Sequence, residues 1–264
     1  MSRLNLTRLR QMKAEQNKIA MLTAYDASFS HVLEEAGVDV ILVGDSLGMV
    51  IQGQESTLPV TVDDIIYHCR NVVRGSDKVF IIADMPFMSY ANAEQAIANA
   101  ARLMAEGGAQ MVKLEGGAVM ASTIEQLTAR GIPVCAHLGL LPQSVHRVGG
   151  YRVQGRDAET ADELIRDAIA LQEAGADMLV LECVPAVLAE KVTKNLTIPV
   201  IGIGAGSDCD GQVLVLYDML GLTPGKRPRF SYDFLADTGA IQSAIAKYVV
   251  EVKSGQFPTL EQQY

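Results

Sequence analysis

Long hydrophobic runs are missing from this 264-residue sequence. No run approaches the roughly 18 apolar residues of a membrane-spanning helix, so we predict no membrane segment. The sequence also has too few basic residues to bind nucleic acids or anionic lipids without specificity. The formal net charge is −9, whereas both of those partners attract a basic surface. We therefore expect no nucleic-acid or membrane partner, although a local basic pocket for an anionic small molecule is still allowed.

Cysteine is scarce as well. The four cysteines are scattered, with no CxxC pair: Cys69, Cys135, Cys183 and Cys209. This spacing argues against a disulfide framework or a zinc site and fits a reducing compartment. Cys135 and Cys183 lie in apolar runs and are predicted to be small core residues. We therefore expect a cytoplasmic protein.

The first 18 residues are basic and carry Leu6, Leu9 and Met12 at helical spacing. A transit peptide has a similar composition. A short amphipathic helix that covers one end of the domain is the favoured interpretation, because the first strand-like run follows directly at Ile19. Residues 1–18 are therefore predicted to be an N-terminal helical extension.

Apolar runs typical of buried strands recur along the chain, and helical patterns separate most of them. The runs lie at residues 19–25, 38–45, 79–85, 111–116, 133–139, 178–183 and 199–204, with an eighth at 213–218. The helical patterns lie at residues 27–36, 62–74, 93–106, 118–130, 157–174, 186–194 and 234–252. Eight β–α units predict a closed (βα)8 barrel, here a single α/β domain over residues 1–264. An open doubly wound sheet is the alternative, because only about eight residues separate the last two strands.

Ionisable residues lie at the ends of five successive predicted strands: Asp45, Asp84, Lys113 with Glu115, His137, and Glu182. In a (βα)8 barrel these strand ends form the face that carries the active site. Burying a charge without a partner is costly, so an inert barrel centre would favour Val, Ile and Leu. Charges on five strands in succession therefore indicate a functional site.

Asp45, Asp84 and Glu115 are three carboxylates on adjacent strands. Placed together they repel one another, which favours a shared proton or a bound cation. Oxygen donors suit a hard divalent ion, Mg²⁺ before Zn²⁺, and Glu115 could act through a water. Lys113 would offset this negative charge and hold the carboxylate of an anionic substrate, with a salt bridge that has no ligand role as the alternative.

A metal ion beside a lysine suits a 2-oxo acid, because the ion stabilises the enolate that forms when the neighbouring carbon loses a proton. Glu182 has apolar neighbours in the sequence, Leu181, Cys183 and Val184. Such surroundings raise the proton affinity of a carboxyl group, as a general base requires. We therefore predict that Glu182 is the base. A structural glutamate bonded to backbone is the alternative.

Two further residues are candidates for contact with the substrate. Ser46 follows Asp45 and could offer its hydroxyl or backbone N–H to a carboxylate. His137 could orient the substrate or relay a proton, and a hydrogen-bonded core histidine is an equal alternative. The long loop at 140–156 has the length of a lid or binding loop. Its arginines, Arg147, Arg152 and Arg156, could meet an acidic tail or simply be solvated.

Nine blocks of the sequence resemble the ketopantoate hydroxymethyltransferase family, from about residue 5 to residue 257 with no large gap. The blocks are VGDSLGM (43–49), STLPVT (56–61), ADMPFMSY (83–90), VKLEGG (112–117), HLGLLPQS (137–144), GGYRVQGR (149–156), LECVP (181–185), PVIGIGAG (199–206) and DGQVLVLYD (210–218). So many blocks in the same order make a chance match very improbable.

The resemblance implies a TIM barrel of the phosphoenolpyruvate/pyruvate superfamily type, assembled as a homodecamer. It implies transfer of a hydroxymethyl group from 5,10-methylenetetrahydrofolate to 3-methyl-2-oxobutanoate. The product would be 2-dehydropantoate, in pantothenate and coenzyme A biosynthesis. The family's residues for the single Mg²⁺ of each subunit match Asp45, Asp84 and Glu115; its substrate contacts match Asp45, Ser46, Asp84 and Lys113; its proton acceptor matches Glu182.

Two other functions stay open. A metal-dependent oxo-acid lyase or mutase on the same barrel would need no folate and would turn over a 2-hydroxy or phosphono substrate. A non-catalytic barrel would bind the keto acid without exchanging its protons. The set of Asp45, Asp84, Lys113, Glu115 and Glu182 argues against the second, because burying such a cluster is costly in a chain without catalytic duty.

Overall fold

The computed structural model describes residues 3–148, 152–223 and 227–264. Its strands form one closed parallel barrel in which each strand pairs with the next along the chain, and the last pairs with the first. The strands are β1 (Ile19–Thr23), β2 (Val40–Val43), β3 (Phe80–Asp84), β4 (Met111–Glu115), β5 (Val134–Gly139), β6 (Met178–Glu182), β7 (Val200–Ile203) and β8 (Gly211–Leu214). The closed barrel confirms the (βα)8 prediction and excludes the open sheet.

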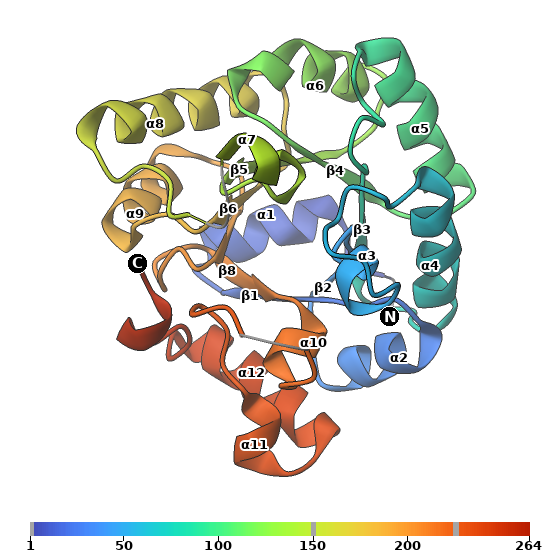
Figure 1. Ribbon diagram of the computed structural model, residues 1–264, viewed down its shortest axis with the longest axis vertical. Helices are drawn as coiled ribbons and strands as arrows, with labels where there is room; N and C mark the ends of the chain where they lie inside the picture. The colour runs from blue at the N-terminus through green and yellow to red at the C-terminus, as the bar shows by residue number, and fades with distance from the viewer. Residues whose placement is uncertain (1–2, 149–151, 224–226) are drawn as a thin grey trace.

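Helices surround the strands (Figure 1). The longer ones are α2 (Ala27–Glu35), α4 (Val62–Arg74), α5 (Ala93–Ala105), α6 (Ala121–Thr128), α8 (Ala158–Glu173), α9 (Ala186–Asn195) and α12 (Ile241–Ser254). Four of them begin at a residue whose side chain accepts a hydrogen bond from a first-turn N–H, namely Asp26, Thr61, Asn92 and Asp157. These caps satisfy backbone donors that would otherwise lack a partner, so the helices start where the sequence provides a short polar side chain.

Short helical turns complete the loops. They are α3 (Leu47–Val50), η1 (Ala118–Met120), η2 (Pro142–Ser144), α7 (Val145–Val148), α10 (Leu216–Met219), α11 (Phe234–Thr238) and η3 (Leu260–Gln262). None of the helices in the described ranges is long and apolar enough to cross a membrane.

The eighth strand differs from the prediction at 213–218. It begins earlier, at Gly211, where a Cβ would lie 2.3 Å from the carbonyl oxygen of Ile19 on β1. Only glycine allows that close approach, and an apolar-run criterion does not detect it. The strand also ends earlier, because Leu216 N donates to Thr23 Oγ1 and the chain turns into α10. No helix lies between β7 and β8, and the helix predicted at 234–252 is divided at Gly239, which has a left-handed φ of 72°.

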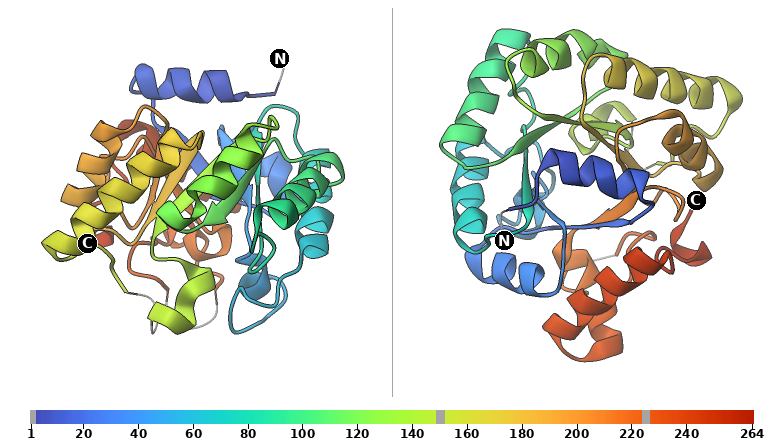
Figure 2. Two further views of the ribbon diagram at one scale, coloured as in Figure 1. Left: turned by 90° about the horizontal axis from the view of Figure 1, so that it is seen from above. Right: turned by 180° about the vertical axis from the view of Figure 1, so that it is seen from behind.

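Helix α1 (Leu6–Ala14) lies across one end of the barrel, opposite the end that carries α7 (Figure 2). Its basic side chains contact residues that precede strands: Arg10 pairs with Asp177 at 2.5 Å, and Lys13 pairs with Asp210 at 2.6 Å. These contacts place α1 over the N-terminal ends of the strands. The helix falls within the predicted extension at residues 1–18.

The apolar face of α1 is expected to contribute strongly to stability. Leu9 is fully buried, and replacing a buried leucine with alanine removes apolar contacts and leaves a cavity. We expect Leu9→Ala to lower the free energy of unfolding by about 2–5 kcal/mol. Urea unfolding followed by circular dichroism measures this, with Thr7→Ala, at an exposed position of the same helix, as the control. Equal midpoints for the two variants would contradict the prediction.

Candidate active site

The ionisable residues predicted from the sequence do meet at the C-terminal end of the barrel. Asp84 lies beside Lys113 in the register of β3 and β4, and Glu115 lies beside His137 in the register of β4 and β5. Glu182 ends β6. Asp45, two residues beyond β2, is 4% exposed, and Asp84, Lys113, Glu115, His137 and Glu182 are also buried. The barrel therefore brings together the charges of all five strands.

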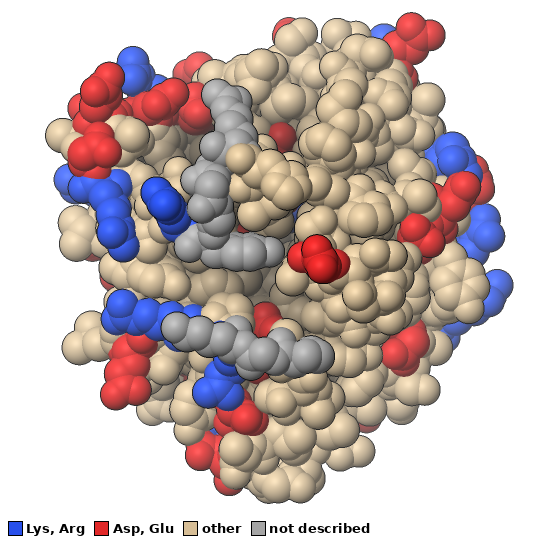
Figure 3. Space-filling view, in the orientation of Figure 1, with Lys and Arg blue, Asp and Glu red and all other residues tan. Residues whose placement is uncertain are grey.

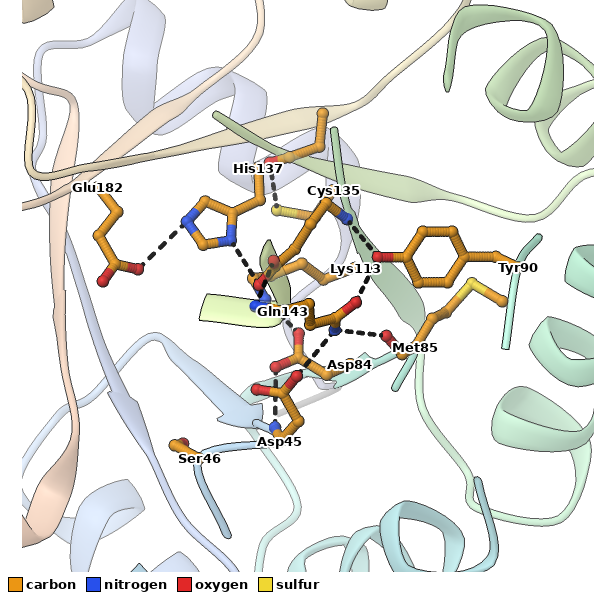
Figure 4. Close-up of polar contacts among 12 residues, drawn as sticks. Asp45, Ser46, Asp84, Met85, Tyr90, Lys113, Cys135, His137, Gln143 and Glu182 are labelled. Atoms are coloured by element: carbon orange, nitrogen blue, oxygen red, sulfur yellow. Dashed lines mark hydrogen bonds and ion pairs between the residues drawn. The ribbon is translucent and has the colours of Figure 1, made fainter. Parts of the chain in front are cut away.

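One half of the cluster joins Asp45, Asp84 and Lys113 (Figure 4). Asp45 N donates to Asp84 Oδ2 at 2.9 Å, and Lys113 Nζ donates to Asp84 Oδ1 at 2.5 Å. Gly44 allows this approach, because a Cβ there would lie 3.3 Å from Asp84 Oδ2. Burial lowers the pKa of Lys113, but the charges of Asp84, Glu115 and Asp45 outweigh it and raise that pKa, so Lys113 is a cation.

The carboxyl group of Asp45 has too little positive charge around it to balance its negative neighbours. Burial, followed by the charges of Asp84 and Glu115, raises the pKa of Asp45 well above its ordinary value. Lys113 and the amide of Gln143 act in the opposite direction without balancing this. A buried carboxyl in such a position either keeps a proton or is neutralised by a further cation.

The other half of the cluster is an imidazole between two carboxylates. His137 Nδ1 lies 3.3 Å from Glu115 Oε1, and His137 Nε2 lies 3.2 Å from Glu182 Oε2. These are ion-pair distances without the alignment of hydrogen bonds. Burial lowers the pKa of His137, but the two carboxylates outweigh it and raise the pKa to about 9. The histidine is therefore charged at neutral pH.

The carboxylate of Glu115 is satisfied within the protein. Burial raises its pKa, but the contact with His137, the charges of His137 and Lys113, and the backbone N–H of Gln143 hold that pKa below its ordinary value. Glu115 is thus an ionised carboxylate with partners on both oxygens: His137 at Oε1 and Gln143 N, 3.1 Å away, at Oε2.

Gln143 is a site residue that the sequence did not single out. Its side-chain Nε2 donates to Asp45 Oδ2 at 2.8 Å and to the carbonyl oxygen of Met85 at 3.0 Å. Its Oε1 accepts from the hydroxyl of Tyr90 at 2.5 Å. With its backbone N–H on Glu115, it joins the two halves of the cluster from the loop after β5 (Figure 4). The available signal was its place in a long loop, within the block HLGLLPQS.

Ser46 lies at the edge of the cluster and is held by β1. Its Oγ is 2.8 Å from the hydroxyl of Tyr25, which donates in turn to Thr23 Oγ1 at 2.9 Å. Tyr25 is only 1% exposed. Its buried ring therefore fixes the position of the Ser46 hydroxyl without itself lying at the surface.

A cavity of about 1250 Å³ adjoins the cluster, and Asp45, Ser46, Lys113 and Glu182 are among its lining residues. Figure 3 shows a hollow near the middle of this face, with basic side chains beside it. Arg152 and Arg156 of the long loop also line it, whereas the side chain of Arg147 lies outside the described residues. A volume of this size holds more than one small substrate.

The residues that the structure describes include no group of three His, Cys, Asp or Glu side chains able to hold a metal ion by themselves. Each oxygen of Asp84 accepts one hydrogen bond, from Lys113 Nζ and from Asp45 N, and Gln143 donates to one oxygen of Asp45. Oxygen atoms of Asp45 and Asp84 still fit Mg²⁺, which usually takes one or two carboxylates and keeps water or substrate oxygens at its other positions.

A closed (βα)8 barrel with buried acids, a lysine and a charged histidine at the carboxyl ends of its strands, beside a large cavity, is the architecture of an enzyme. The family model described as ketopantoate hydroxymethyltransferase matches residues 3–260, and the chain belongs to this family. It is therefore an enzyme of the transferase class.

Relatives of high identity carry the same name. A protein of Nitrosococcus oceani named 3-methyl-2-oxobutanoate hydroxymethyltransferase is 67% identical over 264 residues, which cover 100% of both chains. A protein of the same name from Shewanella loihica is 58% identical over 264 residues, again covering 100% of both.

Solved structures of low identity share the fold. A complex of phosphonopyruvate hydrolase with oxalate and Mg²⁺ gives a TM-score of 0.64 at 16% identity, covering 97% of this chain and 96% of that chain. A 2,3-dimethylmalate lyase, described as a member of the PEP mutase/isocitrate lyase superfamily, gives 0.59 at 16% identity, covering 89% and 88%. These similarities agree with the (βα)8 barrel, and at these identities the likeness extends to the fold alone.

Proposed function

We propose that the protein transfers a hydroxymethyl group from 5,10-methylenetetrahydrofolate to 3-methyl-2-oxobutanoate and so forms 2-dehydropantoate. The observation that carries this proposal is the buried cluster of four carboxylates beside the cavity, which have two cationic partners among the described residues, Lys113 and His137. Such a site suits a divalent ion and a small anionic substrate that loses a carbon-bound proton. The names of the relatives supply the identity of that substrate.

Asp45 and Asp84 are the proposed protein ligands of one Mg²⁺ per subunit, and Glu115 is proposed to act through a water. Each oxygen of Asp84 accepts one hydrogen bond and keeps a second lone pair for the ion. The ion, when bound, supplies positive charge that stabilises an enolate. The raised pKa of Asp45 supports this assignment, because a bound cation would offset the burial and the charges of Asp84 and Glu115 that raise it.

The protein's own residues are then assigned to the chemistry. Lys113 and the hydroxyl and backbone N–H of Ser46 hold the substrate at the floor of the cavity, and Glu182 takes the proton from C3. That carbon then forms a bond to the methylene carbon of the folate. Water supplies the hydroxyl oxygen of the product as the bond from the methylene carbon to the folate nitrogen breaks, and the nitrogen takes up a proton as tetrahydrofolate leaves. His137, charged and 3.2 Å from Glu182, keeps the base oriented toward the cavity in this proposal.

An NMR assay of the purified protein with 3-methyl-2-oxobutanoate, Mg²⁺ and methylenetetrahydrofolate tests the proposal. We expect deuterium exchange at C3 without folate and 2-dehydropantoate with it. Binding of the keto acid without exchange would contradict the proposal and favour a non-catalytic role. Turnover of a 2-hydroxy or phosphono substrate without folate would favour the lyase or mutase alternative, which for now has only a shared fold in its support.

The expected homodecamer, which rests on the family resemblance, and the cytoplasmic location, which rests on the cysteine pattern, belong to the same proposal. Light scattering coupled to size-exclusion chromatography would measure the assembly directly.

Removing the hydroxyl of Tyr90 is expected to loosen Gln143. In Tyr90→Phe the Oε1 of Gln143 loses its donor in a buried setting, so its amide no longer holds Asp45 firmly. We expect kcat/KM to fall by about 5- to 30-fold, the equivalent of roughly 1–2 kcal/mol. Steady-state kinetics measure this, with Tyr67→Phe, an exposed tyrosine, as the control. Unchanged kinetics in Tyr90→Phe would contradict it.

A further inference from the structure

The cavity has a second wall that the chemistry assigned above does not use. Cavities for drug-sized ligands measure roughly 300–1000 Å³, and this one is about 1250 Å³, so a small keto acid leaves most of it empty. The unused wall follows β7 and β8 and includes Ile203, Val215, Asp218 and Phe230. A second ligand therefore has space, and its surroundings are defined by these side chains.

Asp218 is the acidic group of this wall. It is 7% exposed, and Thr223 Oγ1 donates to its Oδ1 at 2.5 Å. Within the described part of the chain, no other side chain donates to its carboxylate, because Arg227 pairs instead with Asp233 at 3.2 Å. Burial raises the pKa of Asp218, as expected for a carboxylate with too few partners. A ligand with N–H donors would correct that shortage.

Asp218 and Glu182, the proposed base, both line this one cavity, so a ligand bound to Asp218 has to place its reactive atom near Glu182. A ligand bound to Asp218 would hold its neighbouring atoms near Glu182. In a methylenetetrahydrofolate the reactive carbon adjoins the pterin, whose pyrimidine ring presents adjacent N–H donors of the kind a carboxylate accepts.

Arg152 and Arg156 are candidates to bind the end of the second ligand that lies away from Asp218. Both side chains are exposed and line the cavity, and neither has an ion-pair partner among the described residues. By contrast, Arg229 of the same lining donates to the carbonyl oxygen of Glu261 and lies over the ring of Tyr264. Unpaired guanidinium groups suit carboxylates, and the glutamate end of a folate carries them, at the end of the molecule distant from the pterin.

We propose that the wall of Asp218, Val215 and Phe230 binds the pterin of the folate co-substrate and that Arg152 and Arg156 bind its glutamate carboxylates. Asp218 accepts hydrogen bonds from the pyrimidine N–H groups, and the apolar side chains pack against the ring. This inference rests on the proposed function and adds to it the location and the polarity of the second substrate.

Asp218→Asn tests the pterin contact, because the asparagine amide replaces one acceptor oxygen with a donor. We expect the KM for methylenetetrahydrofolate to rise at least about tenfold, since a site built for hydrogen bonds loses them. Deuterium exchange at C3 of the keto acid, measured without folate, should stay within about twofold of wild type, because that step involves no pterin. Asp162→Asn, which removes an exposed carboxylate of α8, is the matched control.

Two results would overturn the pterin assignment: an unchanged KM for the folate, or an equal loss of exchange, which would place Asp218 in the keto-acid site or in the folding of the barrel. Thr223→Val is the second variant. It leaves the carboxylate in place but removes its only described donor, and a smaller rise in the same KM is expected.

The arginines are tested with two co-substrates, the full folate and a methylenetetrahydropterin without the glutamate. Arg152→Gln combined with Arg156→Gln should raise the KM for the full folate alone, whereas Asp218→Asn should raise it for both. Arg130→Gln, exposed on another face, is the control. Equal effects of the double variant on both co-substrates, or none, would contradict the assignment of the tail. Absence of product in the wild type would count against the proposed function itself.

Discussion

Deuterium exchange at C3 of 3-methyl-2-oxobutanoate is expected to fall by about 10²–10⁴-fold when Glu182 is replaced with glutamine, because the amide cannot accept the proton. Glu182 ends β6 beside the cavity, with its Oε2 3.2 Å from the charged His137. Glutamine has nearly the same shape, so the loss would report on proton transfer rather than on packing. NMR of the keto acid in deuterated buffer, without folate, measures the rate.

Glu163→Gln is the matched control, since Glu163 is exposed on α8. It should exchange as the wild type does. If Glu182→Gln also exchanged as fast as the wild type, Glu182 would not be the base, and the residue would be left with the structural role that its backbone already performs through the hydrogen bond from Leu140 N.

Removal of divalent metal is expected to lower both exchange and turnover by about 10³-fold or more, the equivalent of several kcal/mol of charge stabilisation. Addition of Mg²⁺ should restore both. The physical reason is the excess of negative charge around Asp45, which Lys113 and His137 do not balance. Full activity after thorough chelation would rule out a catalytic metal.

Thermal unfolding gives a readout of the metal that does not depend on activity. A ligand present at about 100 times its Kd stabilises the folded state by about 2.7 kcal/mol, so Mg²⁺ should raise the melting temperature of the wild type. Asp84→Asn should lose most of that increase. An equal increase in the variant would show that the ion binds elsewhere.

The sequence was most informative where one local pattern decides the structure. Continuous apolar runs predicted the strands, because strands covered on both faces need no alternation. Asp84 and Glu115 end β3 and β4, so their place at one end of the barrel follows from the topology alone. The start of β8 at Gly211 could not be found in this way, because it depends on how closely β1 approaches.

The sequence did not predict the site contacts that join residues far apart along the chain. Gln143 acts through Asp45, which lies 98 residues away along the chain, and no spacing rule connects the two. The flanks of Glu182 in the sequence are apolar, whereas its nearest charged neighbour in space, His137, comes from β5. A sequence shows which charges reach one end of a barrel, but their pairing is decided by register and side-chain packing.

The helix across the N-terminal end of the barrel has a kinetic consequence. With α1 over that end, both proposed substrates would enter the cavity from the opposite face of the barrel (Figure 2). The proposed ligands of the keto acid are buried. The keto acid would therefore have to bind before the folate, which would block its access to them. The proposed sites therefore predict an ordered mechanism, in which 2-dehydropantoate would depart last and inhibit in competition with the keto acid.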